Sequence, residues 1–99
     1  MRMLLKVQMD VEAGNKAIKD GSFGEVLDRV MGQIKPEAAY FTALDGKRTG
    51  LIFFDLQEES QIPAIAEPFF QTVGASIELF PAMTPEDVQK GLGEAAKAF

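Results

Sequence analysis

The stretch that decides the fold is residues 38–56, AAYFTALDGKRTGLIFFDL, in which two runs of strand-forming residues flank Asp45-Gly46. An Asp-Gly pair suits a two-residue turn in which both residues have positive φ, and such turns join antiparallel strands. Neighbouring residues of a strand point to opposite faces, so the turn also decides which side chains share a face. It pairs Leu44 with Lys47, Thr42 with Thr49 and Tyr40 with Leu51.

The two faces of this hairpin differ in character. One face is almost wholly apolar and predicts a core, whereas the other mixes polar and apolar side chains. The apolar face carries Ala39, Phe41, Ala43, Gly50, Ile52 and Phe54; the mixed face carries Tyr40, Thr42, Leu51, Phe53 and Asp55.

The chain before the hairpin predicts one strand and one helix. Residues 2–10 alternate between two rows, which is the period of a strand. Residues 11–21 contain two glycines and are compatible with either a loop or a short helix. Ser22 and Glu25 have the spacing of a capping box, which predicts a helix that begins at Ser22 and ends at Lys35-Pro36.

The chain after the hairpin predicts a helix, a strand and a closing helix. Ser60 is expected to cap a helix that runs to Gly74 and is bent or broken at Pro68, because proline removes one helical hydrogen bond. Residues 76–80 alternate as a strand. Thr84-Pro85-Glu86-Asp87 then has the cap, the proline and the acids that begin a helix.

The element order therefore predicts a single α+β domain over residues 1–99. Its expected form is the ferredoxin-like βαββαβ arrangement, an antiparallel four-stranded sheet with two helices on one face, plus a C-terminal helix. The opposite, open face would leave a patch of apolar side chains exposed to water in a monomer, which is unfavourable. Those residues, Leu4, Leu51, Phe53 and Phe80, predict a homodimer that forms through the open sheet face.

By element order, residues 1–83 resemble the dimeric α/β-barrel superfamily. That group includes small cofactor-free monooxygenases, muconolactone-isomerase-like proteins and stress-response barrel proteins. The resemblance implies two sheets that face each other and enclose a cavity. It transfers no catalytic residue to this chain.

The composition excludes several function classes. The chain has no cysteine and no histidine, so it cannot supply thiolate or imidazole ligands, a thiol nucleophile or a histidine base. Its net charge of −5 argues against a nucleic-acid partner. It has no long apolar run and no signal-like cleavage site near its N-terminus, which predicts a cytoplasmic protein without a membrane segment. No metal or cofactor is expected.

Polar residues of the open face are the main candidate site. In the functional interpretation, Lys6 and Tyr40 hold an anionic or carbonyl group of a small organic ligand, and Asp55 or Glu78 acts as a base whose pKa is raised by burial. In the structural interpretation, which we prefer, Lys6 pairs with Glu78 or Asp55. The candidate ligand-binding residues of this face are Lys6, Gln8, Tyr40, Thr42, Asp55 and Glu78.

A second candidate segment lies between the first strand and the first helix. Asn15 and Lys16 would line the mouth of the cavity and recruit an anion, or they belong to an ordinary solvated turn. Arg48 clamps a carboxylate or is a solvated cross-strand charge. Whether the protein is an enzyme stays open. The alternative is a non-catalytic regulatory or assembly module whose open face is only an oligomer interface.

Overall fold

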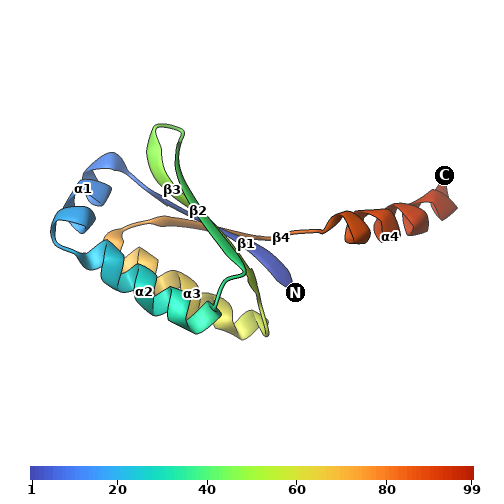
Figure 1. The fold of residues 1–99 in the computed structure, drawn as a ribbon, viewed down its shortest axis with the longest axis horizontal. Coiled ribbons are helices and arrows are strands. Elements are labelled where there is room, and N and C mark those ends of the chain that lie inside the picture. The colour runs from blue at the N-terminus through green and yellow to red at the C-terminus, as the bar shows by residue number, and fades with distance from the viewer.

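Strands and helices alternate along the chain, and the computed structural model describes all of residues 1–99 (Figure 1). The elements are β1 (Arg2–Met9), α1 (Val11–Lys19), α2 (Ser22–Ile34), β2 (Ala38–Leu44), β3 (Lys47–Asp55), a 3-10 turn (Glu59–Gln61), α3 (Ile62–Pro68), a π-helical segment (Phe69–Val73), β4 (Ser76–Pro81), α4 (Pro85–Ala95) and a final 3-10 turn (Ala96–Ala98). None of the helices is both long and apolar enough to cross a membrane.

The four strands form one antiparallel sheet in the order β2-β3-β1-β4. The hairpin pairing predicted from Asp45-Gly46 is confirmed, because Leu44 pairs with Lys47 and Tyr40 with Leu51. Asp45 and Gly46 have φ values of 57° and 73°. These positive values are what a two-residue hairpin turn requires. The turn therefore fixes the faces of β2 and β3.

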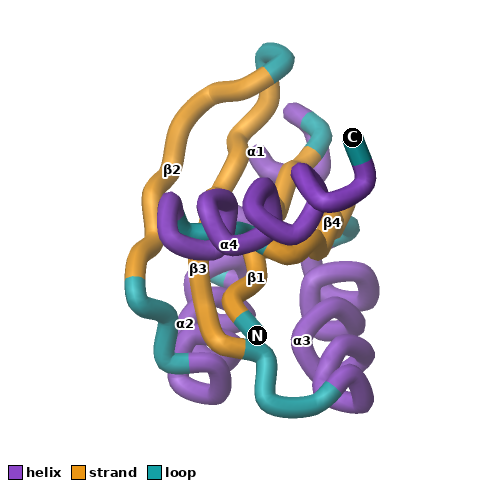
Figure 2. The backbone as a smooth tube through the Cα atoms, turned by 90° about the vertical axis from the view of Figure 1, so that its right-hand side faces the viewer, coloured by secondary structure: helices purple, strands orange, loops and turns teal.

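Helices α2 and α3 lie side by side on one face of the sheet, and the other face is open (Figures 1 and 2). The residues of β1 and β3 under the helices are buried, as their alternation predicts, whereas Ile77 and Leu79 of β4 are partly buried. Val30 of α2 and Phe69, which follows α3, are both 0 % exposed and close the core from the helix side. The buried sheet residues are Met3, Leu5, Val7, Met9, Ile52 and Phe54.

The start of the first long helix differs from the prediction. Residues Val11–Lys19 are helical, which resolves the alternative between loop and helix. The capping box of Ser22 and Glu25 is wrong, because the N-cap is Gly21 with φ 79° and it carries no side-chain cap. The backbone N–H of Ser22 instead donates to Asp20 Oδ1 at 2.9 Å. The tight link from α1 forces a left-handed residue at this place, which favours glycine.

The helix after the hairpin is also capped differently. Ser60 does not cap it; Glu58 and Gln61 form a reciprocal capping box around the 3-10 turn. The expected break at Pro68 is confirmed, because α3 ends there and a π-helical segment follows. The segment ends at Gly74 with φ 63°, as its sequence position predicts.

Helix α4 begins as predicted but does not pack on the sheet. Thr84 Oγ1 accepts a hydrogen bond from Asp87 N at 3.1 Å, and Asp87 Oδ2 accepts one from Thr84 N at 2.9 Å. The helix projects beyond the end of β4 and away from the rest of the molecule (Figure 1).

Candidate functional site

The centre of the open face is an ion pair. The register places Tyr40, Leu51, Lys6 and Glu78 in one row across the four strands. Lys6 Nζ lies 3.4 Å from Glu78 Oε1 and donates a hydrogen bond to it. The Lys6 side chain is 20 % exposed and that of Glu78 is 61 % exposed. Lys6 therefore pairs with Glu78, as the structural interpretation expects.

The next row of the open face is held by hydrogen bonds within the chain. It contains Thr42, Thr49 and Gln8. Gln8 Nε2 donates to Leu44 O and to Thr49 Oγ1, both at 3.1 Å. Thr49 is 3 % exposed and donates to Lys47 O. The amide of Gln8 thus ties β1 to the hairpin, and Thr42 lies beside it without a side-chain hydrogen bond.

Asp55 lies at the far end of β3 and not beside Lys6, because it pairs in register with Arg2. Its carboxylate accepts hydrogen bonds from the N-terminal ammonium of Met1 and from Gln57 Nε2, both at 2.6 Å. The hydrogen bond and the charge of that ammonium lower the pKa of Asp55. The expected rise of this pKa by burial is wrong, since Asp55 is exposed.

Asn15 and Lys16 do not reach the open face. Asn15 Oδ1 accepts a hydrogen bond from Arg48 Nη2 at 3.0 Å, and Arg48 Nη1 donates to Val11 O at 3.4 Å. Lys16 lines a separate hollow between α1 and the π-helical segment, with Asp20, Thr72 and Gly74 among its neighbours. The structure therefore brings the predicted residues together in part, with Lys6, Gln8, Tyr40, Thr42 and Glu78 on one face.

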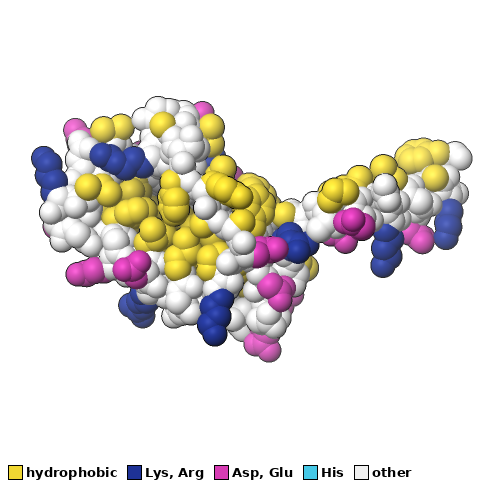
Figure 3. Space-filling view, in the orientation of Figure 1, with side chains coloured by type: hydrophobic (Ala, Val, Ile, Leu, Met, Phe, Trp, Pro, Cys, Tyr) yellow, Lys and Arg dark blue, Asp and Glu magenta, His cyan; other side chains and the backbone are white.

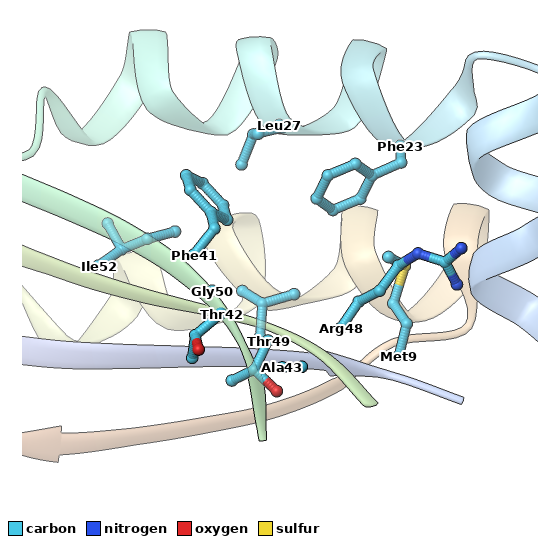
Figure 4. Close-up of a pocket in the computed structure, with 11 residues that line it drawn as sticks. Met9, Phe23, Leu27, Phe41, Thr42, Ala43, Arg48, Thr49, Gly50 and Ile52 are labelled. Carbon is cyan, nitrogen blue, oxygen red and sulfur yellow. The ribbon is translucent and has the colours of Figure 1, made fainter. Parts of the chain in front are cut away.

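An apolar groove that the sequence analysis did not predict lies on the helix side of the hairpin. It has a volume of about 460 Å³ and runs between α2 and the strands β2 and β3 (Figure 4). Figure 3 shows hydrophobic side chains gathered in this hollow of the molecular surface. The lining residues are Val7, Met9, Phe23, Leu27, Phe41, Thr42, Ala43, Arg48, Thr49, Gly50 and Ile52.

The groove exists because α2 does not extend over the edge strand β2. Phe41 points to the helix side, yet it is 54 % exposed. Its ring lies over Gly50, where an added Cβ would come within 3.0 Å of Phe41 Cε1. The absence of a side chain at Gly50 therefore gives the ring its place on the floor of the groove. In the sequence, Phe41 and Gly50 share the apolar face of the hairpin. That pattern predicted a closed core and not a groove.

Arg48 is the only charged residue that lines the groove. Its guanidinium bonds neutral oxygens of α1, and it forms no ion pair with an Asp or Glu. Arg48 is exposed, as expected for a solvated charge, but its guanidinium joins β3 to α1 and does not pair with a charge on a neighbouring strand. A cation beside an apolar surface can bind the anionic group of a mainly apolar molecule.

The groove and the open face differ in the chemistry that they offer. The groove offers one polar side-chain group, the guanidinium of Arg48, because the side chains of Thr42 and Thr49 belong to the open face, and it has no carboxylate, lysine or tyrosine. The open face has a lysine, a tyrosine and carboxylates, but its lysine is paired. No three Asp or Glu side chains gather closely enough to hold a metal ion. No protein-family model, curated protein sequence or solved structure matches this chain, so only its own residues and fold argue for a function.

Proposed function

We propose that the protein is a ferredoxin-like, dimeric α/β-barrel-type domain that binds a small organic molecule as a homodimer. The strand order supports the fold: β1 and β2 run parallel and are separated by β3, and β3 and β4 run parallel and are separated by β1. That is the split βαβ unit, formed twice. Helices α2 and α3 supply the two crossovers on one face (Figure 2).

The observation that carries the binding function is the groove between α2 and the hairpin. Its volume of about 460 Å³ lies within the usual range for small-molecule pockets. Such pockets are mostly apolar and contain a few polar groups that orient the ligand. Here Phe23, Leu27 and Phe41 supply the apolar surface, and Arg48 supplies a cation at one end. The ligand we propose has a compact apolar body and a carboxylate or similar anionic group.

Binding, without catalysis in the groove, is the activity that the lining residues support. A general base or acid must lie within hydrogen-bond reach of the reacting proton. The groove lining contains no Asp, Glu, His, Cys, Lys or Tyr side chain that could take either role.

The open face favours a second candidate role, the non-catalytic assembly module. Lys6 and Glu78 already neutralise each other, and their neighbours on the face are apolar on one side (Leu4 and Phe80) and polar on the other (Gln8 and Ser76). When the sheets of two copies face each other, Lys6 of one copy can lie near Glu78 of the other, and Glu78 of the first near Lys6 of the second. In this role the open face is an interface. Proton transfer by Lys6, Tyr40 and a carboxylate would require the ion pair to open.

The binding proposal is tested with 3-phenylpropionate, a probe that joins an apolar ring to a carboxylate. We expect saturable backbone amide shifts at Phe41 and Arg48 in a nuclear magnetic resonance titration. Ala43→Trp fills the groove from an exposed position of β2, and we expect it to weaken binding by at least about tenfold. Gln33→Trp adds the same bulk on α2 outside the groove and serves as the control.

The outcomes separate the possible sites. Binding that Ala43→Trp leaves unchanged and Lys6→Met abolishes would place the ligand between the two facing sheets. The absence of saturable shifts at the groove, for this probe and a panel of related apolar carboxylates up to millimolar concentration, would contradict the groove as a ligand site.

A further inference from the structure

Helix α4 exposes an apolar stripe that nothing in the chain covers. Leu92 is 64 % exposed and Phe99 is 103 % exposed, and Val88 lies on the same side of the helix. Figure 3 shows hydrophobic side chains gathered along one side of the projecting helix and charged side chains along the opposite side. The radius of gyration is 15.9 Å, whereas a compact chain of this length has about 13 Å. A helix with this pattern needs a partner surface.

The stripe continues the apolar part of the open sheet face. Phe80 pairs with Leu4 on that face and is 40 % exposed. Met83, in the link between β4 and α4, is 71 % exposed and connects the two regions. In the common orientation of Figures 1 and 3, α2 and α3 lie below the sheet and the stripe lies along the upper side of α4. The sheet face and the stripe are thus open to the same side.

We propose that the partner of this stripe is a second copy of the chain. Each α4 reaches past its own sheet and packs against the other copy, so that the interface consists of the two open sheet faces and both α4 helices. The inference rests on the homodimer of the proposed function and adds the helix to its interface.

The buried area argues for the helix as part of the interface. Four strands about 4.8 Å apart and about eight residues long give an open face of about 500 Å². Two such faces bury about 1,000 Å², which is less than the roughly 1,200–2,000 Å² of a standard stable interface. A strip about 10 Å wide along a helix and turn about 22 Å long covers about 220 Å². Two arms packed against equal areas of partner surface outside the two sheet faces raise the total to about 1,900 Å².

The charges of α4 favour a protein partner over a lipid surface. Helices that lie on membranes carry a polar side rich in Lys and Arg. The polar side of residues 85–99 has three acids and two lysines, and Lys97 pairs with Glu94. An anionic lipid surface would repel this side.

Sedimentation velocity over a range of concentrations tests the proposal on the full chain. Leu92→Glu places a charge in the stripe, and we expect it to weaken the dimer by at least about 100-fold. Lys90→Gln makes the same change of net charge on the polar side, and we expect less than about a threefold effect. Leu92 is exposed in the single chain, so neither change should disturb its fold, which circular dichroism checks.

A second measurement does not depend on a disruptive variant. The chain contains no tryptophan, so Phe99→Trp introduces a single reporter into the stripe. We expect the emission of this tryptophan to shift to shorter wavelength as the protein concentration rises and the dimer forms. Emission that does not change with concentration, in a protein that does dimerise, would overturn the role of α4.

The outcomes distinguish this inference from the dimer on which it rests. A wild-type protein that is monomeric at high concentration overturns both the dimer and the role of α4 in its interface. A monomer in which α4 folds back on its own chain is one form of this outcome. A dimer that Phe53→Asp breaks and Leu92→Glu leaves intact overturns only the part played by α4.

Discussion

At the scale of single residues, Arg48 and Gly14 depend on each other. A Cβ added at Gly14 would lie 2.7 Å from Arg48 Nη1, and the three nearest atoms all belong to the Arg48 side chain. Glycine in the middle of α1 thus makes room for the guanidinium that bonds Val11 O and Asn15 Oδ1. The cost to the helix of having glycine instead of alanine is about 1 kcal/mol.

A double-mutant cycle tests this dependence. We expect Gly14→Ala to stabilise the Arg48→Ala variant by about 1 kcal/mol, because only the helix preference then remains. In the presence of Arg48 we expect less than half of that gain, since alanine displaces the guanidinium from Asn15. Urea unfolding of the four proteins measures both gains. Equal gains would show that Arg48 does not occupy the space above Gly14.

A second residue-scale prediction concerns pH. Arg2 Nε donates to Glu37 Oε1 at 2.7 Å, and this hydrogen bond, with the charge of the guanidinium, lowers the pKa of Glu37. As pH falls, Glu37 is protonated in the unfolded chain at a higher pH than in the folded chain. The pair therefore contributes its full stability above the unfolded pKa of Glu37, which is about 4.3. That contribution is lost as pH falls through the lower folded pKa. We expect Glu37→Gln to flatten the acid side of the stability curve, measured as urea midpoints at successive pH values.

The control for this pH effect is Glu25→Gln. The side chain of Glu25 makes no hydrogen bond or ion pair to another side chain, so its loss should leave the acid side steep. An acid side as steep in Glu37→Gln as in the wild type would show that the pair does not contribute to stability.

At the scale of elements, local chemistry decided which predictions are confirmed. The Asp45-Gly46 turn and the Thr84 cap each need only neighbouring residues, so the sequence was sufficient for both. Ser22 and Ser60 also fitted a local pattern, but their outcome depended on the adjoining segment. Only Asp20 and Gly21 separate the end of α1 from Ser22, and the 3-10 turn contains Ser60, so other residues became the caps.

The cap of α4 gives a prediction at this scale. Thr84→Ala removes the acceptor for Asp87 N, and losing such a cap costs a helix about 1 kcal/mol. We expect amide hydrogen exchange in α4 to accelerate by about fivefold in the single chain, while exchange in β1 is unchanged. An equal acceleration in both would mean that α4 and the sheet unfold together.

At the scale of the whole molecule, the candidate site depends on how layers are placed. The faces of the sheet follow from alternation, so the row of Tyr40, Lys6 and Glu78 could be predicted. The groove could not, because it depends on how far α2 extends across β2. Phe41 and Leu27 have the same apolar pattern whether a groove or a closed core lies between them.

A dimer that covers the open face makes stability depend on concentration. Since association stabilises only the folded chain, we expect the melting midpoint of the wild type to rise with protein concentration. Phe53→Asp places a charge on the open face and should give a lower midpoint that is independent of concentration. Calorimetry at several concentrations measures both, and a wild-type midpoint that does not change would contradict the dimer.

The position of β1 at the centre of the sheet has a kinetic consequence. Leu5 lies opposite Ile52 on one side and opposite Leu79 on the other, so most of the chain must be ordered before this strand has both neighbours. Contacts so distant in sequence slow folding, and until they form both edges of β1 can pair with another molecule. Refolding yield should therefore fall as concentration rises, although a higher concentration would stabilise the proposed dimer.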